Sequence, residues 1–507
     1  MNSDSKIQFK ARAKAKAKAK ALLLLLLLAT VCRAQNDPEA TIRALSPVIL
    51  EYHGQLRMDS TDLVKQIVKR HAKNPRVITA IAGMFYEAQD SAAAHRFEEM
   101  ALQFDPKYTA AYVLRGNACL HLYQDTIAAK YWFQKAIDIA PNDPLGYQAM
   151  FNYHIKQKNA ADSTSAMNFA QQLIEHATTD NGKMAAAEIV KRTGGDKETS
   201  VALLEDISLD NMKEEELSRY AYLLCANNMT EKCQKAVDKG IAEYPDNHYF
   251  YRIAMYNYAH AANYPEADKM GVKLFSMMKS DSLATEDYRI YSYCYTAKGE
   301  NEKAIALLWK ANEITNPEWA AQQQLFDRIE EVYKIWAGKL AKEGKYDEAA
   351  AVLQAGIDDF FNHNDEYRAV HCYSALGTMY AQTWAEELNG AEKLEPYRKA
   401  LAMYKDMAER CTDEDYITSG IYRQFFMAYF INRLAPEENF EPYAVTFVER
   451  VFSHSKIGYY DKNIAKALQV LATTQPAQAL NYARRFKQKY PDFKDKDLDD
   501  LIAKLSV

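Results

Sequence analysis

The chain has 507 residues and a formal net charge of −5, with only 17 Gly and 14 Pro. This length allows two or three ordinary domains or one long repeat array, and the many Ala, Glu, Lys and Leu residues favour helix over strand. Outside residues 1–34 no dense run of Lys and Arg occurs. Such a run is needed for a phosphate-binding surface, so we expect no nucleic-acid partner.

Residues 1–34 have the three parts of a secretory signal peptide. Seven Lys and Arg residues precede an unbroken leucine run at 22–28, and the small side chains of Cys32 and Ala34 precede the expected cleavage before Gln35. The apolar stretch, residues 21–32, is shorter than the about 20 residues that a membrane-spanning helix needs. We therefore expect an exported, periplasmic protein that begins at Gln35 and has no transmembrane anchor.

Lipid attachment at Cys32 is the alternative. Bacterial lipoproteins resemble Leu-(Ala/Ser)-(Gly/Ala)-Cys, whereas Ala29, Thr30 and Val31 precede this cysteine and the bulky Val31 fits that pattern poorly. An outer-membrane lipoprotein is the less favoured expectation.

One order of large and small residues recurs along the rest of the chain. It reads Tyr288, Tyr291, Tyr295, Gly299, Ala304, Leu308, Ala311 and Pro317, and parts of it return after Tyr112, Tyr333 and Tyr373. Large residues at i, i+3 and i+7 form the inner stripe of a helix. A Gly turn then reverses the chain, Ala allows a second helix to approach closely, and Pro ends that helix. One such pair cannot bury both its faces, so neighbouring pairs must stack.

This order resembles the tetratricopeptide repeat, W-x2-L-G-x2-Y followed by Ala, an aromatic residue, Ala and Pro. The resemblance covers roughly residues 60 to 495. It implies an all-α fold, a right-handed α-solenoid of tetratricopeptide-type helix-turn-helix repeats. A break at residues 192–196 suggests an N-terminal repeat block, 35–205, and a C-terminal block, 206–507, in which 497–505 form a capping helix.

Departures from the motif are concentrated after Tyr380. The expected Ala is displaced by residues 382–395, and helix is expected to resume near Pro396. Residues 410–470 keep helical amphipathicity but little of the motif.

Motifs of catalysis and cofactor binding are missing from the sequence. It has no GxxxxGK[ST] loop, no GxGxxG, no HExxH and no GxSxG. His363 and His371, with Asp365 and Glu366 between them, are the nearest approach to a metal cluster, but the two histidines lack i, i+4 helical spacing. We predict a non-enzyme with no catalytic residue, no cofactor and no metal.

The candidate binding residues lie on four successive first helices. The residue after the first large residue is Ser218, Arg252, Arg289 or Lys334, and the residue four positions later is Tyr222, Tyr256, Tyr293 or Gly338. In tetratricopeptide arrays this face lines the concave groove where ligands lie. Tyrosines beside cations would stack on an extended chain and pair with its carboxylates. Packing against the next repeat is the alternative role of these tyrosines. The predicted ligand-binding residues are Tyr222, Tyr256, Tyr293, Arg252, Arg289 and Lys334.

These features predict a protein-binding scaffold or adaptor of the cell envelope, whose partners are protein or peptide segments of acidic character. Only Asn117 matches part of the carboxylate clamp of cytoplasmic chaperone adaptors, and this poor match agrees with an exported location.

The alternative function is that of a glycan-binding protein, similar to the helical starch-binding proteins of outer-membrane uptake systems. The chain has only five Trp residues to serve as sugar platforms. The sequence leaves the oligomeric state open.

Two further features concern single residues. The six cysteines of the mature chain are scattered, so we expect buried thiols, and Cys225 and Cys233 are the one pair that spans a predicted turn. The six are Cys119, Cys225, Cys233, Cys294, Cys372 and Cys411.

Five short segments that begin at Asp59, Asp90, Asp125, Asp162 and Asp281 resemble the Asp-(Ser/Thr) acceptor of an O-glycosylation system of exported bacterial proteins. The same residue types are also preferred helix caps.

Overall fold

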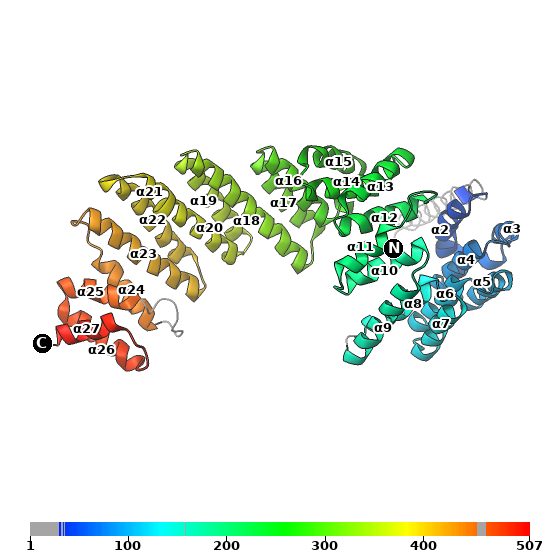
Figure 1. Ribbon diagram of the computed structural model, residues 1–507, viewed down its shortest axis with the longest axis horizontal. Coiled ribbons are helices and arrows are strands. Elements are labelled where there is room, and N and C mark those ends of the chain that lie inside the picture. The colour runs from blue at the N-terminus through cyan, green and yellow to red at the C-terminus, as the bar shows by residue number, and fades with distance from the viewer. Residues whose placement is uncertain (1–29, 32–33, 35, 158, 454–462, 507) are drawn as a thin grey trace, which may run out of the picture. The chain divides into compact units, whose positions relative to one another are not determined.

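The computed structural model describes residues 30–31, 34, 36–157, 159–453 and 463–506. Every regular element of these residues is a helix (Figure 1). No helix in this part of the chain is both long and apolar enough to span a membrane. The expected signal peptide lies outside the described residues except at positions 30, 31 and 34, so it stays a prediction.

The chain forms two compact units, Met1–Asn257 and Tyr258–Val507. The predicted boundary between two repeat blocks, at residues 205 and 206, stays a prediction. Gly194, which belongs to the predicted break at residues 192–196, lies in the turn between two helices that pack together. The first unit contains α2 (Pro38–Leu56), η1 (Met58–Ser60), α3 (Asp62–Arg70), α4 (Pro75–Glu87), α5 (Ser91–Phe104), α6 (Thr109–His121), α7 (Thr126–Ile139), α8 (Pro144–Ile155), α9 (Ala160–His176), α10 (Asp180–Arg192), α11 (Lys197–Glu205), α12 (Glu214–Ala226), α13 (Thr230–Glu243) and most of α14 (His248–His260).

The second unit contains the helices that follow α14. They are α15 (Tyr264–Met277), η2 (Ser280–Ser282), α16 (Thr285–Ala297), α17 (Asn301–Thr315), α18 (Trp319–Lys342), α19 (Tyr346–Asn362), α20 (Glu366–Thr378), η3 (Met379–Trp384), α21 (Ala385–Glu387), η4 (Gly390–Lys393), α22 (Leu394–Arg410), α23 (Glu414–Leu434), α24 (Glu441–Ser453), α25 (Ile464–Thr474), α26 (Pro476–Lys489) and α27 (Lys496–Leu505).

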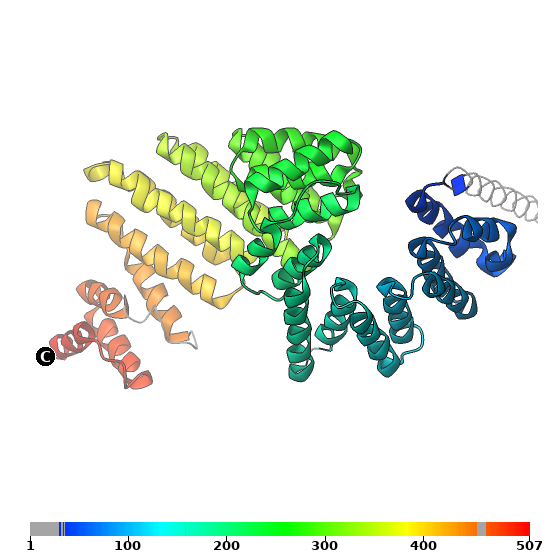
Figure 2. The ribbon, with the colours of Figure 1, turned by 45° about the vertical axis from the view of Figure 1, so that its right-hand side comes forward.

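Successive helices pack in pairs, and the pairs stack. In the first unit α4 packs on α5, α6 on α7, α8 on α9, α10 on α11 and α12 on α13, while the first helices α4, α6, α8, α10 and α12 contact one another in series. In the second unit α16 packs on α17 and α18 on α19, and α16, α18 and α20 form the corresponding series. Figures 1 and 2 show these staggered pairs from two directions. The pairing confirms the predicted α-solenoid of tetratricopeptide-type repeats within each unit.

The small residues of the motif allow the helices of a pair to approach closely. A Cβ atom on Gly116 of α6 would lie 2.3 Å from the ring of Phe133 on α7, so only glycine fits there. Ala129 and Ala136, one turn before and after Phe133, are buried as well. The spacing of small and large residues in the sequence therefore has a packing cause: each small residue leaves room for an aromatic ring of the partner helix.

Most turns inside the pairs have one backbone feature, a single residue in the left-handed region. It is glycine at Gly299 (φ 77°) and Gly344 (φ 74°), as the motif predicts. Other turns inside the pairs place residues with a Cβ in the same conformation, namely Gln89, Gln124, Asn228 and Ala262, and Asn364 adopts it between α19 and α20. Each of these side chains adds backbone strain that glycine avoids.

Arginines link five of the first helices, α10, α12, α18, α20 and α23, to the preceding first helix. A guanidinium nitrogen donates to a polar side chain across the interface in each case: Arg192 to Asn152 (2.9 Å), Arg219 to Glu188 (2.8 Å), Arg328 to Thr296 (2.8 Å), Arg368 to Asp327 (2.5 Å) and Arg423 to Ser374 (3.1 Å). These bonds fix the register of neighbouring repeats on the face that the first helices share.

The irregular stretch after Tyr380 contains short helices. The segment η3 is a π-helix that continues α20, and α21 and η4 follow before α22 begins at Leu394. The predicted capping helix is also present, as α27.

Four of the five aspartates that begin the glycosylation-like segments have structural roles. Asp90 and Asp125 are N-cap residues, and their carboxylates accept hydrogen bonds from the backbone of Ala93 and Ala128 at 2.9 Å. Asp59 pairs with Arg96, and Asp162 lies 2.5 Å from His154. The helix-cap alternative thus holds for Asp90 and Asp125, and modification of the neighbouring hydroxyl groups stays a prediction.

Candidate functional site

The six predicted binding residues are divided between the two units. Arg252, Tyr222 and Tyr256 belong to the first unit, and Arg289, Tyr293 and Lys334 belong to the second. All six lie on first helices, α12, α14, α16 and α18, as the motif predicts. Each unit is described by itself below.

In the first unit, Tyr222 is an exposed aromatic side chain. It is 53% exposed, and Lys191 of the preceding first helix lies over its ring at 4.9 Å. Tyr256 and Arg252 are half-buried, and the Arg252 guanidinium lies 5.4 Å from the Tyr249 ring centroid. Tyr222 thus has the accessible position that a groove residue needs.

In the second unit, Tyr293 is largely covered by its neighbours. The guanidinium of Arg328, which is 3% exposed, lies 3.6 Å from the ring centroid, and Tyr264 stacks on the ring at 6.4 Å. Arg289 donates two hydrogen bonds, of 2.7 and 2.6 Å, to the carboxylate of Glu286 on its own helix. Tyr293 therefore has packing contacts of the alternative role, and Arg289 already has a carboxylate partner.

Lys334 lines a cleft between the first helices α18 and α20. The cleft encloses about 550 Å³, and Leu353 of α19 contributes to its lining. Ala337, Gly338 and Ala341 of α18 leave space opposite Ala375 of α20. These three α18 positions follow Lys334 at helical spacing, so that one stripe of small residues produces the opening.

The π-helix η3 forms one end of this cleft. Met379 and Thr383, both within η3, contribute to the lining, together with Thr378 at the end of α20. A π-helical turn shifts the side chains that follow it around the helix axis, and such turns occur frequently at functional sites. The end of the cleft is consequently shaped by the part of the sequence that departs from the repeat motif.

The electrostatics of the cleft favour an anion. Glu330 is buried and pairs with Lys334, while His371 Nδ1 lies 3.0 Å and Arg368 Nε 3.8 Å from its carboxylate oxygens. Arg368 is also held by Asp327 at 2.5 Å and by Asp365 at 2.6 Å, so Lys334 is the cation that balances Glu330. Lys342 is exposed at the cleft, and among the described residues it has no ion-pair partner. The lining is therefore net positive.

A second cleft lies in the first unit, between α6 and α8. It encloses about 400 Å³ and is lined by three carboxamides, Asn117, Gln148 and Asn152, and by Tyr153 and Lys156. Carboxamides both donate and accept hydrogen bonds, so this cleft suits uncharged polar groups such as peptide bonds or sugar hydroxyls.

The histidines singled out in the sequence have separate surroundings. His363 stacks on Trp309 at 3.7 Å, and its Nδ1 lies 2.7 Å from the carbonyl oxygen of Asp359. His371 instead lies in the wall of the α18–α20 cleft. Sequence spacing identified neither role, because Trp309 and Glu330 are distant along the chain.

Comparison with known proteins gives no family assignment. No family model and no curated protein matches the sequence significantly. Among solved structures, PilW, a type IV pilus biogenesis factor, is 15% identical with a TM-score of 0.30 over 50% of this chain and 97% of its own. The C-terminal part of a TPR repeat-containing protein from Cytophaga hutchinsonii is 16% identical with a TM-score of 0.28 over 56% and 99%. A human IFIT1 dimer with PPP-AAAA is 12% identical with a TM-score of 0.35 over 81% and 88%. At such scores these similarities say nothing of function, and the fold assignment rests on the helix pairs of this chain.

Proposed function

We propose that the protein is a non-enzymatic scaffold of the cell envelope that holds a carboxylate-bearing segment of a partner protein in the cleft between α18 and α20. The observation that carries this proposal is the net positive lining around Glu330, with Lys342 exposed and unpaired among the described residues. An acidic side chain or a chain terminus supplies the complementary charge. The basic leader and small-residue exit of residues 1–34 support the envelope location.

The cleft has the form of a peptide site. Its walls are two adjacent helices, and Ala337, Gly338 and Ala341 leave room for an extended segment. Ser374 and Thr378 offer hydroxyl groups that can pair with the backbone of that segment. Because Arg423 donates to Ser374 Oγ at 3.1 Å, the hydroxyl is held at the wall of the cleft.

Gly338 provides the sharpest test. A Cβ atom there would meet no atom within 4 Å, so Gly338→Leu fills the cleft with a side chain that the helix tolerates. Partner proteins are captured from envelope extract on the wild-type chain, and the affinity of the identified segment is then measured with variants. We expect Gly338→Leu and Lys342→Glu each to weaken binding by at least about tenfold.

Lys339→Glu is the matched control, because Lys339 is an exposed residue of the same helix outside the cleft. It introduces the same charge reversal and should leave affinity within about twofold of wild type. If both cleft variants bound the segment with wild-type affinity, or if Lys339→Glu lost as much affinity as they did, the cleft would not be the binding site.

A glycan partner is the second candidate, favoured by the carboxamide-lined cleft between α6 and α8. Carboxamides and an aromatic ring are the groups that bind sugar hydroxyls and sugar faces. If this reading is correct, the wild-type chain is retained on immobilised polysaccharide and Asn117→Ala weakens that retention. Retention that depends on Gly338 or Lys342 instead would contradict a glycan site between α6 and α8.

A further inference from the structure

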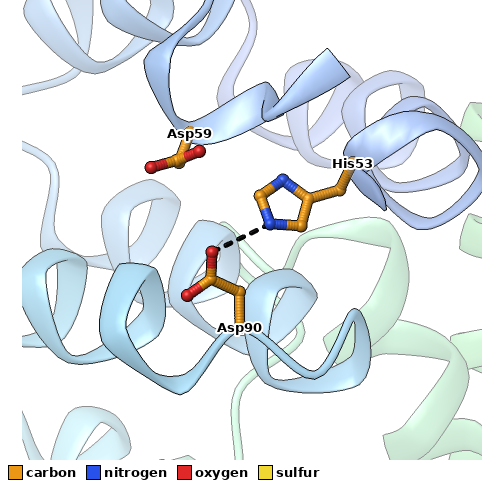
Figure 3. A group of neighbouring side chains, drawn as sticks. All are labelled: His53, Asp59 and Asp90. Carbon is orange, nitrogen blue, oxygen red and sulfur yellow. Dashed lines mark hydrogen bonds and ion pairs between the residues drawn. The ribbon is translucent and has the colours of Figure 1, made fainter. Parts of the chain in front are cut away.

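Three side chains with metal-binding atoms converge near the start of the first unit. His53 lies near the end of α2, Asp59 lies in η1 and Asp90 is the N-cap residue of α5 (Figure 3). One potential ligand atom from each lies within 4.8 Å of those of the other two. The three come from separate helices, so the fold alone brings them together.

The cluster is mostly buried, with the Asp90 side chain 22% exposed, and it is incompletely satisfied. The side chains of His53 and Asp59 are each 6% exposed. His53 Nδ1 and Asp59 Oδ1 are buried atoms without a hydrogen-bond partner among the described residues. Buried polar atoms are nearly always paired in folded proteins, because an unpaired atom loses its hydration without compensation. The unpaired Asp59 Oδ1 indicates that a further group completes the cluster, whereas His53 Nδ1 is not the ring nitrogen that faces Asp90.

The carboxylates already have defined neighbours. Asp90 Oδ2 lies 2.9 Å from His53 Nε2, while Asp90 Oδ1 accepts the Ala93 N–H, an interaction that lowers the pKa of Asp90. Arg96 donates to Asp59 Oδ2 at 2.7 Å, and Arg57 Nε lies 3.6 Å from Asp59 Oδ1. Both arginines have mostly exposed side chains, 57% and 73%, so each can move into water if a cation takes its place.

We propose that His53, Asp59 and Asp90 bind one divalent transition-metal cation of the Zn²⁺ class. An imidazole nitrogen and two carboxylate oxygens form a donor set that Zn²⁺ accepts, whereas Mg²⁺ and Ca²⁺ select oxygen ligands alone. Two carboxylates beside a neutral imidazole balance a charge of two.

The distances are close to those of a zinc site. Ligands about 2.0–2.2 Å from zinc in tetrahedral geometry lie roughly 3.3–3.6 Å apart. The His53–Asp90 contact of 2.9 Å is slightly shorter than this, and the 4.8 Å limit of the cluster is longer. Small side-chain movements therefore bring all three ligands into range, and water would take the fourth position.

Such a cation would be structural. It would link the end of α2 and η1 to the N-terminus of α5, next to the core that α2, α4 and α5 share. Because metal binding requires the folded arrangement of ligands, binding would stabilise this part of the solenoid.

The test uses the full chain, stripped with a chelator and then titrated with Zn²⁺ alone. Zinc retained after desalting is measured by elemental analysis, with the shift in Tm as a second readout. We expect about one zinc per chain and a higher Tm with Zn²⁺ but not with Mg²⁺. His53→Gln and Asp90→Ser should each weaken binding by at least about tenfold. Serine preserves the helix cap, so the second variant remains folded.

His154→Gln is the matched control. His154 Nδ1 lies 2.5 Å from Asp162 Oδ1, a comparable histidine–aspartate pair outside the cluster. Its zinc affinity should equal that of the wild type. Failure of the wild type to retain zinc, or equal retention by the cluster variants, would overturn the proposal and leave an ion-pair network at these residues.

Discussion

Tyr222→Ala and Tyr293→Ala should differ sharply in their effect on stability, although the two residues occupy equivalent positions in the repeat. Tyr222 is 53% exposed and contacts Lys191, itself exposed, so its replacement removes a cation–π contact of only about 0.5 kcal/mol. Tyr293 covers the buried guanidinium of Arg328 at 3.6 Å, a desolvated contact of about 2 kcal/mol. The stacked ring of Tyr264 adds about 0.5–1.5 kcal/mol. We expect losses of about 0.5 and about 3 kcal/mol.

The assay is urea unfolding followed by far-ultraviolet circular dichroism, with Tyr222→Phe and Tyr293→Phe as controls that keep the rings. Both Phe variants should unfold close to the wild-type midpoint. Equal losses for the two Ala variants would refute the reasoning. A small loss for Tyr293→Ala would restore this residue as an accessible groove residue, whereas the expected large loss would make it a packing residue.

Three further predictions concern the turns, the cysteines and the leader. Ala262→Gly should raise the free energy of unfolding by about 0.5–1 kcal/mol and Gly344→Ala should lower it by about 1 kcal/mol, because both positions have positive φ. Opposite signs in urea unfolding would exclude turn strain as the cause. Burial raises the pKa of Cys372 to about 12, so iodoacetamide at pH 8 should label this thiol in urea but not in the native chain; equal labelling rates would contradict its burial. Intact mass of the exported protein should correspond to a chain that begins at Gln35, and an acylated Cys32 would exclude that cleavage.

The repeats could be predicted because their signal is local. Tyr288, Tyr333 and Tyr373, which open three of the recognised units, are all buried, and the spacing of large residues places them on one helix face. Weaker units were harder to recognise because their turns lack the glycine of the motif. In its place they have Gln124, Asn228 or another residue with a Cβ in the left-handed conformation.

The contacts that decide the binding sites could not be predicted, because they join distant residues. Arg328 covers Tyr293 from the next first helix, and nothing in the sequence around Tyr293 indicates that contact. The cluster of His53, Asp59 and Asp90 likewise has no motif spacing, and the sequence analysis predicted no metal ligand. Only the stacking of helices brings those side chains together.

The arginine links explain why the cleft lies where it does. Arg368 crosses from α20 to Gln323 and Asp327 and so fills the interface along the first turns of α18. The later turns of α18 carry Ala337, Gly338 and Ala341 on the stripe that faces α20, and these small side chains leave the gap open. The resemblance to tetratricopeptide repeats predicts one continuous groove along the first helices. Between α18 and α20 this face instead has a segment closed by Arg368 and an open segment beside Gly338. Of the six predicted binding residues, Lys334 lines the open segment between α18 and α20, which is why the proposed function places the partner segment there.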